Sequence, residues 1–120
     1  MIERIPDLPE NVLGFSAKGK LTANDYETVI IPEVETMLAR QGKVRFLYHL
    51  GEEFSGIEAA AALDDAKLGL KHFTGWERVA IVSNVEWIRL AVRVFGLAMP
   101  GHIRVFDNGH FAEAKRWMSE

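Results

Sequence analysis

Two short, nearly continuous apolar runs constrain the fold of this chain more than any other feature. Residues 43–50 read KVRFLYHL and residues 78–82 read RVAIV. Runs of this length are typical of strands that are covered on both faces, as in a parallel sheet. Segments with helical periodicity separate them, so the chain is expected to alternate strands with helices and to form an α/β fold.

Three further strands are expected. Residues 2–5 form a short strand that ends at the Pro-Asp-Leu-Pro turn, and residues 12–20 form a second strand with Leu13, Phe15 and Ala17 on one face. These two segments are expected to pair as an antiparallel hairpin at the edge of the sheet. The last strand covers residues 103–106.

Capping patterns predict where the helices begin. Thr22 with Asp25 forms a capping-box pattern, and Gly42 stands where a helix of this length would end. Pro32 is expected to kink this helix or to split it. Further capping boxes at residues 55–58 and 83–86 open the next two helices, and Asp107-Asn108-Gly109 leads into the last one.

The second helix is expected to bury one apolar face. That face consists of Ala59, Leu63, Ala66, Leu70 and Phe73, while the acidic and basic side chains lie largely away from it. The predicted order is β-β-α-β-α-β-α-β-α. This order gives a mixed, mostly parallel sheet of four to five strands with four helices, in a single domain over residues 1–120.

Composition excludes several classes of function. The net charge is -3 and no Lys/Arg cluster is present, so nucleic-acid binding is not expected. The chain has no cysteine, which excludes disulfides and thiolate sites. No secretory signal opens the chain and no run approaches the ~18 apolar residues of a membrane span, so a cytoplasmic protein is expected. Nucleotide-binding and hydrolase motifs are absent, which favours a protein that is not an enzyme and needs no cofactor or metal.

Several segments together resemble a known family. They are residues 21–26, 31–35, 42–45, 54–56, 78–82, 86–87, 104–106 and 113–117. Their order and spacing resemble the small bacterial SpoIIAA-like (STAS/SEC14-type) proteins over nearly the whole chain. The resemblance implies a sheet of four or five strands with four helices.

The same resemblance draws attention to Ser55. Anti-sigma-factor antagonists of this fold are switched by phosphorylation of a serine in an Asp-Ser-Ser/Thr-Gly motif at the start of a helix. Here the stretch reads Glu53-Phe54-Ser55-Gly56, so Phe54 departs from that motif. Ser55 is therefore interpreted as a helix cap supported by Glu58, with phosphorylation as the alternative.

Polar side chains after the strands are candidates for chemistry. His49, Glu52 and Glu53 follow one strand, and an imidazole with two carboxylates is able to form an acid–base pair or a metal site. The favoured interpretation of these residues, and of Ser83, Asn84, Asp107 and Asn108, is that they cap helices and form turns. The remaining histidines, His72, His102 and His110, are expected on the solvated surface.

The helix over residues 85–98 is apolar on two sides. One stripe contains Ile88, Ala91, Val92 and Phe95, and a second contains Trp87, Leu90, Val94 and Leu97. Either the core covers both stripes, or a partner, a ligand or a second subunit covers one of them.

Two functions follow from these observations. The leading one is a non-enzymatic STAS-like regulatory or protein-binding module that acts as a homo-oligomer or with a protein partner. The alternative is a small carrier that holds an apolar or lipid-like ligand between helices and sheet, next to Phe54, Phe73, Trp76 and Trp87. An enzyme that uses His49 with Glu52 or Glu53 is a third possibility.

Overall fold

A five-stranded sheet forms the centre of the molecule in the computed structural model, which describes all residues 1–120. The strand order is β1-β2-β4-β6-β7, with β1 antiparallel to β2 and every other neighbouring pair parallel. The strands are β1 (Ile2–Arg4), β2 (Val12–Ala17), β4 (Val44–Leu50), β6 (Trp76–Ser83) and β7 (His102–Phe106). The predicted mixed, mostly parallel sheet with an antiparallel edge strand is confirmed.

A second, two-stranded sheet was not expected from the sequence. It pairs β3 (Gly19–Leu21) with β5 (Phe54–Ile57) in parallel. The predicted strand over residues 12–20 is therefore divided. The division falls at Lys18, and the next residue, Gly19, has a φ of 66°, a conformation that glycine adopts at little cost and that turns the chain away from β2.

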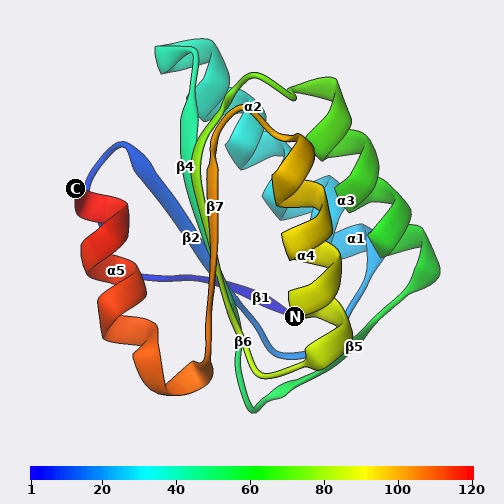
Figure 1. Cartoon of the computed structure of the whole chain (residues 1–120). Coiled ribbons are helices and arrows are strands. Elements are labelled where there is room, and N and C mark those ends of the chain that lie inside the picture. The colour runs from blue at the N-terminus through cyan, green and yellow to red at the C-terminus, as the bar shows by residue number, and fades with distance from the viewer.

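The helices are divided unequally between the two faces of the central sheet. Figure 1 shows α5 alone on one side, with α3 and α4 on the other. From β2 onward each parallel strand is added on the same side of the previous one, so right-handed crossovers place the connecting helices on one face. The helical segments are α1 (Ala23–Asp25), the π-helix η1 (Tyr26–Ile30), α2 (Ile31–Gln41), α3 (Ala59–Lys71), α4 (Glu86–Ala98), the short 3₁₀-helix η2 (Asn108–His110) and α5 (Phe111–Ser119).

The first helical run, residues 23–41, begins and ends as predicted. The backbone N–H of Asp25 donates to Thr22 Oγ1 at 3.1 Å, and the backbone N–H of Thr22 donates to Asp25 Oδ2 at 3.0 Å. Gly42 ends the run with a φ of 75°. Pro32 divides it, because the turn before the proline widens into η1 and Pro32 stands in the first turn of α2, where its missing N–H costs little.

Strand β4 is buried on both faces, as its apolar sequence predicts. Phe46 and Tyr48 belong to the larger core, which lies between the sheet and the helices on the α3–α4 side. Leu47 points the other way into a smaller core with Ala114 and Met118 of α5. Alternation of side chains along one strand therefore supplies the centre of both cores.

The predicted buried face of α3 is wrong. Ala61 and Leu68 are the buried residues of this helix, whereas Leu63 and Leu70 are exposed. The helix is rotated about its axis relative to the prediction. The apolar periodicity did not identify the packed side because four alanines precede Leu63 and make several faces equally apolar.

The capping box at Thr22 yields a stability prediction. Thr22→Ala removes the acceptor for the Asp25 N–H and is expected to lower the free energy of unfolding by about 1 kcal/mol. Thr28→Ala is the matched control, since the Thr28 hydroxyl only donates back to the Asn24 carbonyl and its loss is expected to cost less than ~0.5 kcal/mol. Urea unfolding of both variants measures the difference, and equal losses would contradict the capping role.

Candidate functional site

Two cavities lie on opposite faces of the central sheet. An apolar groove of about 550 Å³ lies between α3, α4 and the sheet. A polar pocket of about 640 Å³ lies on the other face, beside β1, β2 and the start of α5. Polar and charged side chains dominate one cavity, and apolar side chains dominate the other.

The apolar groove has strands as its floor and helices as its walls. Small residues on the walls leave the space open: Ala66 and Gly69 come from α3 and Ala91 comes from α4. The ring of Phe95 reaches across to Gly69, where an added Cβ would lie 3.4 Å from its Cζ. The other lining residues are Ile30, Phe46, Tyr48, Asp65, Leu68, Leu70, Trp76, Val79, Ile81, Val92, Met99 and Ile103.

One polar cluster interrupts this apolar lining. The Tyr26 hydroxyl donates to Asp65 Oδ1 at 2.9 Å and lies 3.0 Å from the Tyr48 hydroxyl. Desolvation raises the pKa of the Asp65 carboxyl. It also raises the pKa of both phenols, with the Asp65 charge adding to the effect. The acidic residues of α3 were expected to lie away from its apolar side. This prediction is wrong for Asp65, which lines the apolar groove and is reached by solvent through it.

The structure separates the two apolar stripes of α4. Ile88 is buried, while Ala91, Val92 and Phe95 line the groove. The second stripe faces outward and is not part of the groove. Its exposed fractions are 59% for Trp87, 63% for Leu90, 61% for Val94 and 90% for Leu97.

The two aromatic candidates outside α4 lie elsewhere. Trp76 is buried in the groove floor, where its indole N–H donates to the Gly69 carbonyl at 3.3 Å. Phe54 is half-buried in β5 and packs against the larger core, away from the groove lining. The structure therefore does not place Phe54 with the outward residues of α4.

The interpretation of Ser55 as a helix cap is wrong. Ser55 is exposed in β5, and α3 begins only at Ala59 with no side-chain cap. Pairing with β3 keeps the chain extended as far as Glu58, whose N–H donates to the Leu21 carbonyl at 2.8 Å. The Glu58 carboxylate instead accepts from the Ala23 N–H at the start of α1, at 3.1 Å. Phosphorylation of Ser55 stays a prediction, without the helix N-terminus that motivated it.

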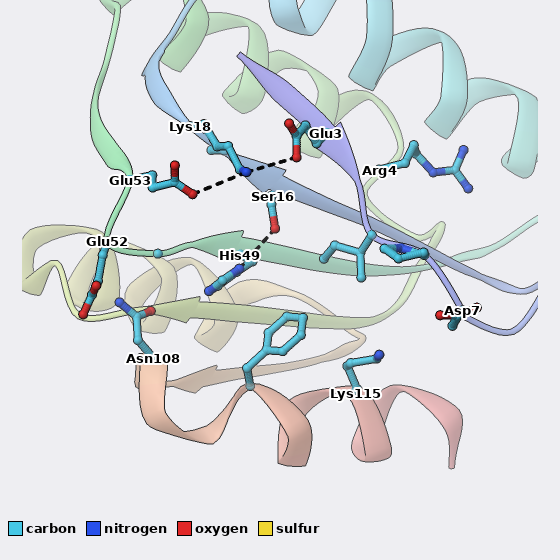
Figure 2. Close-up of a pocket in the computed structure, with 15 residues that line it drawn as sticks. Glu3, Arg4, Asp7, Ser16, Lys18, His49, Glu52, Glu53, Asn108 and Lys115 are labelled. Carbon is cyan, nitrogen blue, oxygen red and sulfur yellow. Dashed lines mark hydrogen bonds and ion pairs between the residues drawn. The ribbon is translucent and has the colours of Figure 1, made fainter.

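His49 occupies the polar pocket, which Figure 2 shows. Its Nδ1 lies 3.1 Å from Ser16 Oγ, and its ring stacks at a tilt on Phe111 with centroids 4.6 Å apart. Burial lowers the pKa of the imidazole. Gly51 makes room for the ring, because a Cβ at this position would lie 2.8 Å from His49 Nε2.

The predicted partners of His49 are engaged elsewhere. Glu53 forms an ion pair with Lys18 at 3.3 Å, and Lys18 also contacts Glu3 at 3.2 Å, as the dashed lines in Figure 2 show. Glu52 lines the pocket but is exposed. No hydrogen bond joins His49 to either carboxylate, and no group of three or more His, Asp or Glu side chains is placed to hold a metal ion.

Residues after the other strands form turns, as the favoured interpretation states. Asp107 Oδ1 accepts from the Gly109 N–H at 3.0 Å, and Asn84 Oδ1 accepts from the Asn108 N–H at 2.8 Å. The capping box predicted at residues 83–86 is wrong, because α4 begins only at Glu86, its N-cap is Val85 and no side chain caps it. Ser83 is buried, and its hydroxyl accepts from the Val85 N–H at 3.1 Å in the turn before the helix.

The three remaining histidines differ in how far they are exposed. His102 and His110 are exposed, as predicted. His72 lies at the C-terminal end of α3 with its side chain 25% exposed and its Nε2 3.5 Å from the Glu35 carboxylate, so it is less solvated than predicted.

Comparison with known proteins agrees with this architecture. The SpoIIAA-like family model matches residues 12–119, and the chain belongs to this family. A similar solved structure is an uncharacterized protein of the DUF3478 family with a SpoIIAA-like fold from Shewanella loihica PV-4. It is 35% identical, has a TM-score of 0.73, and the match covers 98% of this chain and 93% of that chain. No curated protein matches the chain.

The length of the helices bears on membrane topology. None of them combines the length and the apolar character that crossing a bilayer requires.

The environment of His49 yields a pH prediction. We expect its pKa to lie below the ordinary value of 6.5, because the half-buried ring disfavours the charged form. The folded state then prefers neutral His49, so this contribution to stability is complete above pH ~6.5 and is lost as the pH falls through the folded pKa. NMR titration of the ring protons measures the shift, with His49→Gln to assign the signal. Titration at or above the ordinary value would contradict it.

Proposed function

We propose that the protein is a small non-enzymatic binding module that holds an apolar or lipid-like ligand in the groove between α3, α4 and the sheet. The single observation that carries this proposal is the groove itself. Its volume of about 550 Å³ lies within the range of ~300–1,000 Å³ that is usual for small-molecule sites.

The chemistry of the lining supports an apolar occupant. Of the 16 residues that line the groove, 14 are hydrophobic. Each methylene group that a ligand buries there contributes about 0.8 kcal/mol, so an alkyl chain of about eight carbons gains roughly 6 kcal/mol before the entropic cost of binding. The related SEC14-type domains bind lipids in an apolar pocket, but they are much longer and none of their lipid-binding motifs carries over to this chain.

The polar pocket supports an enzyme less well. His49 forms a hydrogen bond with the Ser16 hydroxyl, but no carboxylate orients the imidazole. Glu52 is exposed, and Glu53 forms an ion pair with Lys18. In enzymes that pair a nucleophile with a general base, a third side chain normally orients the base through a hydrogen bond. Binding in the apolar groove therefore accounts for more of the observed geometry.

A second candidate function rests on the outward face of α4. Trp87, Leu90, Val94 and Leu97 follow one another at intervals of three or four residues and are all more than half exposed. A contiguous exposed apolar strip on a helix is typical of an interaction surface. This observation favours a STAS-like regulatory or protein-binding module that self-associates or binds a protein partner through α4.

Ala91→Phe tests the groove. The added ring is expected to occupy the space that Ala91 leaves open and to weaken the binding of dodecanol at least about tenfold. Ala98→Phe is the matched control, because it lies two turns further along the same helix and outside the groove. Isothermal titration calorimetry measures both affinities. Equal affinities in the two variants would show that the ligand binds elsewhere or not at all.

Leu90→Glu combined with Leu97→Glu tests the outward face of α4. If this face joins two copies, the charges are expected to convert a dimer into a monomer, since burying an unpaired carboxylate is unfavourable. Light scattering during size-exclusion chromatography measures the mass. Arg93→Glu, an exposed charge reversal on the same helix, is expected to leave it unchanged. A monomeric parent protein would remove self-association from this candidate.

A further inference from the structure

The protons of the cluster in the groove all point the same way. A phenol has one proton to donate, and that of Tyr26 goes to Asp65 Oδ1 at 2.9 Å. In the 3.0 Å contact between the two hydroxyls, Tyr48 must therefore be the donor and the Tyr26 oxygen the acceptor. The result is a relay from Tyr48 through Tyr26 to the carboxylate, in which both phenolic protons are used.

Only acceptors remain for anything that enters the groove. Asp65 receives one hydrogen bond, from Tyr26, and forms no ion pair within the chain. An ionised carboxylate has about four lone-pair positions, so most of its capacity is unused. Tyr48 and Asp65 both line the groove, and the other lining side chains are almost all apolar.

We infer that the ligand of the groove is a single-chain amphiphile whose head group donates hydrogen bonds, an alkylammonium or an alcohol, and not a fatty-acid anion. This inference rests on the proposed function. An ammonium or hydroxyl group placed beside Asp65 supplies the donors that the cluster lacks, while its alkyl chain lies along Ala66, Gly69 and Ala91.

Electrostatics points in the same direction. Asp65 lines the groove among apolar side chains, and no cation of the chain forms an ion pair with it. Charges interact more strongly in such surroundings than in bulk water, so a second carboxylate would be repelled and an ammonium attracted. The affinity for the neutral alcohol is expected to lie between the affinities for the amine and the acid.

Three ligands of equal chain length test the inference: dodecylamine, dodecanol and dodecanoate, titrated calorimetrically into the unmodified protein at neutral pH. We expect the amine to bind at least about a hundredfold, and the alcohol at least about tenfold, more tightly than the acid. Asp65→Asn removes the charge while keeping the shape of the side chain. It is expected to weaken the amine at least about tenfold and to strengthen the acid.

Asp64→Asn is the matched control. It removes the same charge from the neighbouring position of α3, which does not line the groove, and is expected to change none of the three affinities more than about twofold. If Asp65→Asn does not fold, the order in which the unmodified protein binds the amine, the alcohol and the acid tests the inference by itself.

The outcomes separate this inference from the proposed function. If all three ligands bind equally, or the acid binds best, the inference is overturned while ligand binding in the groove stands. If Asp65→Asn folds and leaves the order of affinities unchanged, the inference is overturned as well. If none of the three binds, the proposed function is overturned together with the inference.

Discussion

The rest of the structure depends on β4, because it is the middle strand of the central sheet and contributes side chains to both cores. Alternating side chains send Phe46 and Tyr48 toward α3 and α4 and send Leu47 toward α5. The same alternation separates the two cavities: Tyr48 lines the apolar groove, whereas the next residue, His49, lines the polar pocket. Two successive residues of β4 therefore face opposite sides of the sheet, one an apolar groove and the other a pocket that contains ion pairs.

Much of the fold could be predicted because its determinants are local. The apolar runs identify the central strands, and Thr22 with Asp25 marks a helix start since the two side chains exchange hydrogen bonds within one turn. A capping-box pattern with the same spacing, Ser55 with Glu58, is misleading, because pairing between β3 and β5 holds that segment extended. This pairing joins residues far apart in the sequence, and no local pattern reports it.

The candidate site was less predictable for a similar reason. His49 and its glutamates are visible in the sequence, but Ser16 becomes its neighbour only through the register of β2 with β4, which aligns the two residues. Asp65 has the spacing of a surface residue and acquires its role from Tyr26, 39 positions earlier. The groove itself depends on small wall residues such as Gly69 and Ala91, which carry no signal of a cavity until the helices that bear them are placed together.

The order β2-β4-β6-β7 never reverses, so this sheet lacks the crevice at which doubly wound folds bind ligands beyond their strand ends. The groove lies instead over the middle of the strands, beneath two helices that follow one another around β6. Half of the residues that line it lie on α3 and α4, and none lies in the turns that follow the strands. Under the proposed function, substitutions on these two helices would change the ligand while the strands and turns stay the same.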